Sequence, residues 1–268
     1  MKPPRFEYLA PASLAAALAA KAEHGAEARF LAGGQSLIPA MNFRLAQPGV
    51  LIDINGLAEL DYVREDGTLR IGALTRLRKL EHTALLAEAV RHVAHPQIRN
   101  RGTLGGNLAH ADPASELPAV MLALDARLHL KSRNSHRSID ARDFFVGALT
   151  TALRDDEMLV EVELPALAPR TGTAFLEVAR RRGDYAMMGV AAVITLGART
   201  NVRLAFCNAG ETPVLVELAQ IQDAAAQVQA KIDPPGNVHA SKDFQRHLAG
   251  VLTRRALQIA LARAEGRR

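Results

Sequence analysis

Apolar and polar residues alternate along the first 60 residues in patterns that predict both helices and strands. Leucines four positions apart in an alanine-rich run predict a helix that begins after the N-cap residue Ser13 and ends at Gly25. Short apolar runs at 28–31 and 50–54 predict two buried strands. A loop and a short helix are expected between these strands.

The middle of the chain combines the two patterns again. Apolar residues three to five positions apart predict a helix over 76–92, and the apolar run 116–124 predicts a buried helix. A glycine-rich stretch, 101–107, lies between these two helices. Alternating residues at 127–130 and 158–164 predict two further strands.

Two turn-forming residues, Pro169 and Gly172, indicate a domain boundary near residue 168. The pattern beyond them predicts strands at 174–179, 190–196 and 202–209, then closing helices at about 214–231 and 241–265. The predicted fold class is therefore α+β, with one part over 1–168 and a smaller part, a sheet plus helices, over 169–268.

The composition is that of an ordinary globular protein, with 268 residues of which 49% are hydrophobic and 23% are charged. There is a single cysteine, Cys207. One cysteine cannot form an intrachain disulfide, hold an iron–sulfur cluster or complete a cysteine-based zinc site. Any redox chemistry of this chain therefore needs a bound organic cofactor or a partner.

The polar residues do not assemble into a recognisable catalytic or metal-binding motif. None of the nine histidines forms a His-x-x-x-His pair, and His110 and Asp112 lack an evident third ligand. Ser36 lacks the Gly-x-Ser-x-Gly elbow, and Cys207 has no evident histidine partner. We therefore predict no metal site and no catalytic residue.

The net charge of +5 raises the question of a nucleic-acid partner. The excess of lysine and arginine lies in residues 169–268 and is scattered there, and only 4% of the chain is aromatic. Neither a dense basic block nor a stacking surface is present. We expect no nucleic acid as partner; a protein partner or an anionic ligand fits a basic C-terminal part better.

The N-terminus has a superficial likeness to a secretory signal, because Lys2 and Arg5 precede an apolar stretch. Glu7, Pro11 and Ser13 interrupt that stretch, and a helix accounts for it better. No run of about 18 apolar residues exists that could span a membrane. The sequence therefore predicts a cytoplasmic protein without membrane association.

Two glycine pairs are the strongest candidates for ligand binding. Gly33-Gly34 directly follows a predicted strand, and Gly105-Gly106 lies in the glycine-rich stretch. Paired glycines let backbone N–H groups approach an anion that a Cβ would hold away, and Ser36, Thr103 and Asn107 add side-chain donors. Neither segment matches a Walker or Rossmann motif. Taken alone, each pair is more simply explained as a tight turn.

Together these segments resemble the FAD-binding medium subunit of the molybdenum hydroxylases, the xanthine oxidase and carbon monoxide dehydrogenase family. Residues 32–39 (AGGQSLIP) with 51–54 (LIDI) are similar to the first FAD motif of that family. Residues 98–108 (IRNRGTLGGNL), continuing through 112–118 (DPASELP), resemble its second motif. Residues 180–186 (RRRGDYA) are similar to the start of its C-terminal domain, and the resemblance covers nearly the whole chain.

The resemblance implies a fold and a cofactor. Residues 1–168 would form a FAD-binding domain of the vanillyl-alcohol oxidase type, with lobes at about 1–55 and 56–168, and 169–268 would form the C-terminal domain typical of the medium subunits. The two glycine segments would hold the pyrophosphate from opposite lobes. The implied FAD-binding residues are Ala32, Gly33, Gly34, Gln35, Ser36, Leu37, Ile98, Gly102, Thr103, Gly105, Gly106, Asn107, Ala111, Glu116, Leu159, Asp184 and Tyr185.

The resemblance also implies partners and a function. Members of this family work with a small subunit that carries 2Fe–2S clusters and a large subunit that carries the molybdopterin cofactor, as a dimer of heterotrimers. This chain would take electrons from the 2Fe–2S clusters onto FAD and pass them from reduced FAD to an external acceptor. Substrate would be oxidised on another subunit. The substrate and the acceptor are not implied.

One departure and two alternatives stay open at this point. Glu177 stands where some relatives carry a lysine near the flavin, so the flavin redox potential cannot be carried over. One alternative is a stand-alone FAD-dependent reductase or oxidase, for which the C-terminal third offers no evident substrate site. The other is a flavin-free assembly subunit, against which the intact glycine pairs argue.

Overall fold

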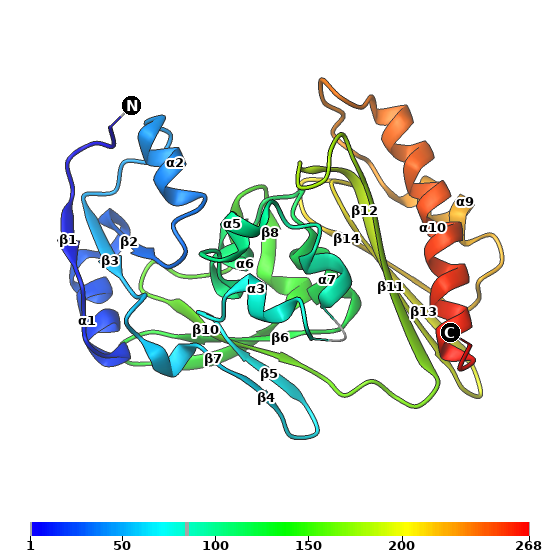
Figure 1. Ribbon diagram of the computed structural model, residues 1–268, viewed down its shortest axis with the longest axis horizontal. Helices are drawn as coiled ribbons and strands as arrows, with labels where there is room; N and C mark the ends of the chain where they lie inside the picture. The colour runs from blue at the N-terminus through cyan, green and yellow to red at the C-terminus, as the bar shows by residue number, and fades with distance from the viewer. Residues whose placement is uncertain (1, 84–85, 268) are drawn as a thin grey trace.

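The computed structural model describes residues 2–83 and 86–267 of the chain. Three main sheets follow one another across the molecule, from a small N-terminal sheet through a central sheet to a C-terminal sheet (Figure 1). Helices lie beside each sheet, so the α+β class predicted from the sequence is confirmed. None of the described helices combines the length and the apolar character that crossing a membrane requires.

The N-terminal lobe is a three-stranded parallel sheet covered by a helix. Its strands are β1 (Glu7–Leu9), β2 (Ala28–Leu31) and β3 (Val50–Asp53), in the order β1-β3-β2. Helix α1 (Leu14–His24) begins as predicted, where Ser13 Oγ accepts a hydrogen bond from the backbone N–H of Ala16, and ends at Gly25 with φ +50°. Helix α2 (Leu37–Asn42) follows β2.

The central sheet has five antiparallel strands drawn from distant parts of the sequence. In spatial order they are β4 (Val63–Glu65), β5 (Leu69–Gly72), β10 (Met158–Leu164), β6 (Arg127–Lys131) and β7 (His136–Asp140). The predicted strand over 158–164 is therefore the middle strand. One sheet face is apolar, with Ile71, Leu128 and Val162 in the main core, whereas the other carries charged residues.

Short helices pack on the apolar face of the central sheet. They are α3 (Leu77–Leu80), α4 (Ala87–Val90), α5 (Pro96–Arg99), α6 (Leu104–His110), α7 (Glu116–Ala123) and α8 (Ala141–Phe144), followed by the hairpin β8 (Phe145–Gly147) and β9 (Thr150–Thr151). Helix α7 is buried along its whole length, as predicted.

The prediction of a single helix over 76–92 is wrong. The structure has α3 and α4 there, and residues 84–85 between them lie outside the described part of the chain. Around this break Thr83 N–H donates to the carbonyl of Leu80, and Leu86 N–H to that of Thr83. The apolar side chains of both helices lie in the same core, which accounts for the helical spacing of the whole segment.

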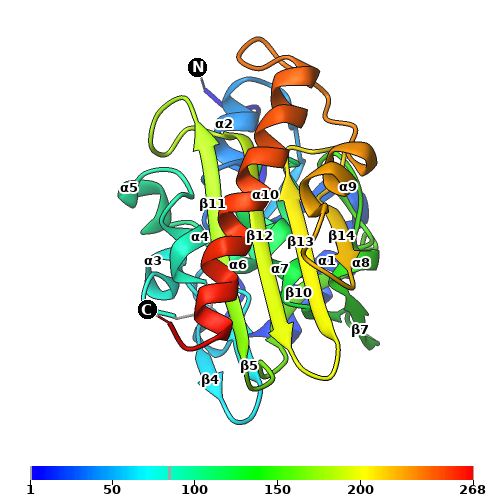
Figure 2. The ribbon, with the colours of Figure 1, turned by 90° about the vertical axis from the view of Figure 1, so that its right-hand side faces the viewer.

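The C-terminal part is a four-stranded antiparallel meander of β11 (Thr171–Ala179), β12 (Ala186–Leu196), β13 (Thr200–Cys207) and β14 (Val214–Leu218). The long helix α10 (Lys242–Ala264) crosses one face of this sheet, with the short α9 (Ala224–Lys231) beside it (Figure 2). The other face packs against α7 through Ala191, Ala205 and Cys207. The predicted boundary at 168 falls between β10 and β11 and stays a prediction as a domain division.

The predicted helix over 214–231 is also wrong, because its first residues form β14 and only its second half is α9. Val216 and Leu218 are buried, and Glu217 between them is exposed, which is the alternation of a strand. Pairing of Val216 with Leu204 on β13 completes the sheet. Tertiary pairing thus outweighed the helical spacing of the segment.

Candidate functional site

The two glycine segments, distant in sequence, lie against each other where the N-terminal lobe meets the central part. A Cβ on Gly33 would lie 2.5 Å from the carbonyl oxygen of Arg101 and 2.8 Å from Cα of Gly102. Such distances leave no room for any side chain. Backbone therefore touches backbone at this point, and the structure brings the first and second sequence motifs together.

The first glycine segment presents a row of free backbone donors. Among the described residues, no acceptor receives a hydrogen bond from the backbone N–H groups of residues 33–37. Gly34 has φ +74°, which lets successive N–H groups turn toward one side of the chain. Ser36, at the start of α2, is exposed. This run of unpaired donors is the arrangement that binds phosphate oxygens.

The second glycine segment differs from the open loop that the sequence suggests, because Gly105, Gly106 and Asn107 form the first turn of α6. Gly105 N–H donates to the carbonyl of Ala73 at 2.8 Å, and Gly106 N–H donates to Thr103 Oγ1 at 3.1 Å. Thr103 is buried and caps the helix. Their roles as FAD contacts stay predictions, since these donors are already used within the chain.

Gly106 nevertheless lies exposed beside the first segment. The residue is exposed, and a Cβ on it would meet Thr103 Oγ1 at 2.8 Å and lie 3.7 Å from Cβ of Ala32. Asn107 follows it, and its Oδ1 accepts a hydrogen bond from Ser115 Oγ at 3.0 Å. Gly102, just before α6, donates its N–H to the carbonyl of Ile98 at 2.7 Å.

A polar bridge that the sequence analysis missed joins the lobes beside the glycine contact. The Arg76 guanidinium donates to Asn55 Oδ1 at 2.7 Å and also to the carbonyl oxygen of Arg101. Asn55 in turn donates to the carbonyl of Leu31, at the end of β2. No local motif marks this bridge, because its members come from three separate segments.

Asp53 continues this bridge into the N-terminal sheet. Its carboxylate accepts hydrogen bonds from the Tyr8 hydroxyl at 2.5 Å and from the Asn55 side chain at 2.6 Å. Burial would raise the pKa of Asp53, but these hydrogen bonds outweigh it, so the pKa is lowered. Asp53 therefore anchors Asn55 as a stable anion at neutral pH.

The remaining predicted site residues gather beyond the other end of α6. Ala111 ends the helix with φ +50°, and Asp112 follows it. Tyr185, in the turn between β11 and β12, is 68% exposed; burial of its inner part and the Asp112 carboxylate raise its pKa. Asp184 N–H closes that turn by donating to the carbonyl of Arg181.

Two predicted residues are almost completely inside the protein. Glu116, the first residue of α7, is 5% exposed, and burial together with the neighbouring Glu177 raises its pKa to about 8. Leu159, on β10, is also 5% exposed and belongs to the main core. The predicted contact of Leu159 with the adenine end of FAD stays a prediction.

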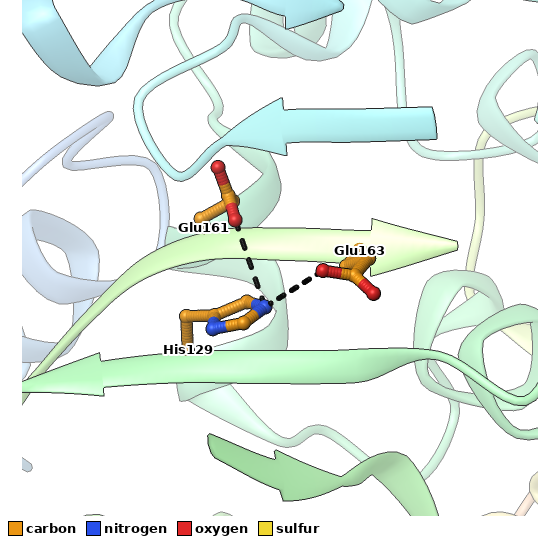
Figure 3. Close-up of side chains that lie close together, drawn as sticks. All are labelled: His129, Glu161 and Glu163. Atoms are coloured by element: carbon orange, nitrogen blue, oxygen red, sulfur yellow. Dashed lines mark hydrogen bonds and ion pairs between the residues drawn. The ribbon is translucent and has the colours of Figure 1, made fainter. Parts of the chain in front are cut away.

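A separate polar cluster lies on the charged face of the central sheet. His129 Nε2 is 3.2 Å from Glu163 Oε2 and 3.6 Å from Glu161 Oε1, and the three ligand atoms lie within 4.8 Å of one another (Figure 3). Arg70 contacts both carboxylates, at 3.1 and 3.6 Å. Its guanidinium offsets one of the two carboxylate charges of the cluster.

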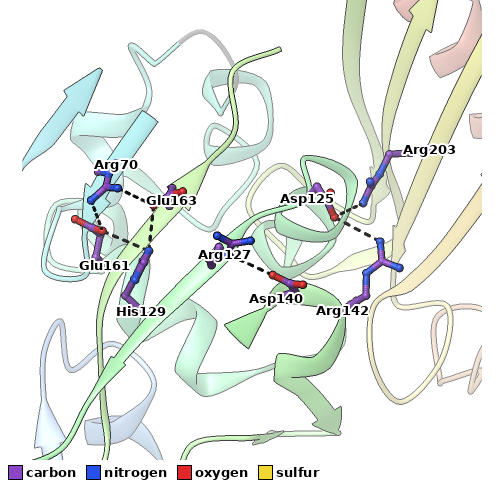
Figure 4. A network of polar contacts seen from close by, with 9 residues as sticks. All are labelled: Arg70, Asp125, Arg127, His129, Asp140, Arg142, Glu161, Glu163 and Arg203. Carbon is purple, nitrogen blue, oxygen red and sulfur yellow. Dashed lines mark hydrogen bonds and ion pairs between the residues drawn. The ribbon is translucent and has the colours of Figure 1, made fainter. Parts of the chain in front are cut away.

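Figure 4 shows this cluster and two further sets of ion pairs near it, one between Arg127 and Asp140 and one of Asp125 with Arg142 and Arg203. Arg203, on β13, binds Asp125 at 3.0 Å and also donates to the carbonyl of Leu122 at 2.8 Å. Because Leu122 and Asp125 lie at the end of α7, these contacts tie the C-terminal sheet to the central part of the molecule.

The fold and the contact between the two glycine segments are those of a two-lobed FAD-binding protein. A family model described as the FAD binding domain in molybdopterin dehydrogenase matches residues 4–167. The chain belongs to this family. It is of the type that forms the FAD-binding subunit of molybdenum-dependent oxidoreductases.

Known relatives align along most of the chain. The 6-hydroxypseudooxynicotine dehydrogenase complex subunit alpha of Paenarthrobacter nicotinovorans is 39% identical, over 98% of this chain and 97% of the relative. Caffeine dehydrogenase subunit beta of a Pseudomonas species is 45% identical, over 80% of this chain and 76% of the relative. A solved carbon monoxide dehydrogenase from Hydrogenophaga pseudoflava superposes with a TM-score of 0.92 at 37% identity, covering 98% of this chain and 99% of that one.

Proposed function

We propose that this chain holds FAD at the contact between its two glycine segments and works as an electron-transfer subunit of a molybdenum hydroxylase. The observation that carries the proposal is the row of unpaired N–H groups at residues 33–37, held against the Arg101–Gly102 backbone. These donors fit the pyrophosphate of a dinucleotide, since several N–H groups without an internal acceptor follow one another in a short segment.

The proposed site extends from the glycine contact along α6. Residues 32–37 would bind the pyrophosphate, with 98, 102–103 and 105–107 forming the opposite wall. Ala111, Glu116, Asp184 and Tyr185 lie toward the far end of α6 and would face the flavin. Leu159 completes the proposed set. The proposed FAD-binding domain is 1–168, with lobes near 1–55 and 56–168, and 169–268 is the proposed C-terminal domain of the medium-subunit type.

Bound FAD would supply reversible uptake of electrons, which come from 2Fe–2S clusters of a small partner subunit and leave to an external acceptor. The chain's own residues bind and orient the cofactor and need no acid–base catalyst for electron transfer. A large partner subunit would carry the molybdopterin cofactor, in a dimer of heterotrimers. The cytoplasmic location stays a prediction of the sequence.

The names of the relatives support a shared role rather than a shared substrate. They refer to 6-hydroxypseudooxynicotine, caffeine and carbon monoxide, which have little chemistry in common. If substrates meet a different subunit, one FAD-binding chain can serve all of these reactions. We therefore propose that substrate oxidation takes place outside this chain.

The test is co-expression of the chain with its small and large partner subunits, followed by measurement of the absorbance spectrum and of acid-released flavin. Electron transfer is tested by reducing the partner's clusters under anaerobic conditions and following bleaching of the flavin absorbance. A complex whose clusters are reduced while its flavin stays oxidised would refute the electron-transfer role. A chain that reduces its flavin with a substrate of its own would favour a stand-alone reductase.

A further inference from the structure

Two carboxyl groups are buried where α7 meets the C-terminal sheet. Glu177 pairs across the sheet with Gly189, which pairs with Cys207, and the next residue, Asn208, donates its N–H to the carbonyl of Pro113, just before α7. Glu116 is 5% exposed, and the side chain of Glu177, on β11, is 2% exposed. Glu177 Oε2 is buried and has no hydrogen-bond donor among the described residues. Two adjacent negative charges at such a site would repel each other strongly, and an unpaired buried carboxylate oxygen is costly.

The groups that face Glu116 are acidic or uncharged. Asp112 approaches it from the loop before α7, Tyr185 from the β11–β12 turn and Glu177 from β11. Cys207, on β13, is fully buried beside both glutamates. Burial raises the pKa of its thiol, and the negative charges of these two acids raise it further. None of these groups is a cation. The local field therefore favours a protonated Glu116 at neutral pH.

Glu177, in contrast, faces a basic opening to solvent. His92 Nδ1 lies 3.6 Å from Glu177 Oε1, and the His92 side chain is 39% exposed. Both residues line a cavity of about 260 Å³ together with Arg91, Ala179, Arg181 and Arg182. The three arginines give this opening a positive charge.

We propose that Glu116 and Glu177 share a single proton at neutral pH and that this proton exchanges with the cavity through His92. The Glu116 carboxylic acid donates to Glu177 Oε2, which gives the orphaned oxygen its partner. For release, the proton passes from Glu116 to Glu177 and then to His92 Nδ1, while the Nε2 proton of His92 leaves to water in the cavity. The charge of the pair changes from −1 to −2.

The role of this proton in flavin reduction rests on the proposed function. Electron uptake by a bound flavin is accompanied by proton uptake, and Tyr185 places the acid pair next to the proposed flavin end of the site. The acid pair of this chain would therefore couple flavin reduction to pH.

Infrared spectroscopy of the full chain with isotope-labelled glutamate carboxyls tests the shared proton, whether or not flavin is bound. We expect one protonated-carboxyl band at neutral pH, lost as the pH rises through about 8. E116Q should abolish the band, and the control E163Q, on the charged face of the central sheet, should leave it. Absence of the band in the wild-type chain, or its survival in E116Q, would overturn the proposal even if FAD binds normally.

The same infrared band tests whether the proton leaves the acid pair through His92. Transfer into D2O shifts a protonated-carboxyl band to lower frequency, and the rate of this shift measures proton exchange. H92F should slow the shift several-fold, whereas H82F, at a histidine outside the cavity, should not. An unchanged rate in H92F would overturn the proposed exit.

Discussion

Gly33 of the N-terminal lobe lies so close to Arg101 that a Cβ on Gly33 would come within 2.5 Å of the Arg101 carbonyl oxygen. The contact joins two segments that are 68 positions apart in the sequence. It holds the free N–H groups of residues 33–37 in place beside α6. The geometry of the proposed cofactor site therefore depends on the absence of a side chain at this position.

Gly33→Ala should destabilise the chain and weaken FAD binding, because the methyl group must push the Arg101–Gly102 backbone away. Overpacking of this kind costs roughly 1–3 kcal/mol of unfolding free energy. Gly56→Ala is the matched control, since nothing lies within 4 Å of its would-be Cβ. Urea unfolding and flavin content measure the two effects. Equal stability and flavin content in the two variants would show that the contact does not matter.

Gly172 makes a second close contact, between β11 and α10. Its would-be Cβ falls 1.9 Å from the carbonyl oxygen of Ala260 and 2.5 Å from the backbone nitrogen of Ala264. Gly172→Ala should therefore lower the unfolding free energy by about 2 kcal/mol or more, because helix and strand must separate. Gly197→Ala, whose Cβ would make an ordinary 3.6 Å contact, should be nearly neutral in the same thermal unfolding experiment.

Arg137 and Glu157 form a buried ion pair whose loss should be measurable. Two guanidinium nitrogens of Arg137 lie 2.7 Å from the two Glu157 oxygens, and the Glu157 side chain is 1% exposed. Arg137→Ala leaves a buried carboxylate unpaired and should cost roughly 2–3 kcal/mol at neutral pH, less than in a fully buried pair because Arg137 is partly exposed. Arg127→Ala, which breaks the exposed pair with Asp140, should cost less than about 1 kcal/mol.

The same ion pair predicts an acid dependence. The hydrogen bond from Arg137 lowers the pKa of Glu157 below its ordinary value of 4.5, despite burial. The stabilisation is therefore present above pH 4.5 and disappears as the pH falls through the lowered pKa. In Arg137→Ala the unfolding free energy should decline less steeply over this acid range. An identical acid profile in both proteins would contradict the pairing.

Glu116 predicts the opposite pH dependence. Its pKa is raised by burial and Glu177 from 4.5 to about 8, so the folded chain binds more protons than the unfolded chain between these values. The unfolding free energy should therefore fall as the pH rises through this window. Glu116→Gln should flatten that slope. Denaturant titrations at a series of pH values measure it, and an equally steep slope in the variant would refute the assignment.

Local signals predicted part of this structure, and long-range contacts decided the rest. Ser13 and Gly25 mark the ends of α1 in the sequence because capping is local. The segment 214–231 was misassigned because pairing of β14 with β13 is invisible in its own spacing. The helical spacing of 76–92 likewise hid a turn between α3 and α4.

In the candidate site, too, some features could be predicted from local sequence and others depend on long-range contacts. The glycine pairs stand out in the sequence, but their mutual contact depends on how the lobes pack. The cap that Thr103 forms on α6 was not predicted, and its expected contact with a ligand stays a prediction. The Glu116–Glu177 pair could not be predicted, because it joins α7 to β11 across 61 positions of the sequence. The Arg76–Asn55 bridge likewise forms only in the folded chain.

The most direct test of the account is the flavin content of the chain purified with its partner subunits, measured by absorbance and by chromatography of acid-released flavin. We predict about one FAD per chain in the wild type, with flavin absorbance near 370 and 450 nm. Gly106→Trp, which would place a bulky side chain beside Ala32, should lose this FAD while the complex still assembles. A colourless wild-type chain that takes up no added FAD, even with both partners present, would contradict the central claim.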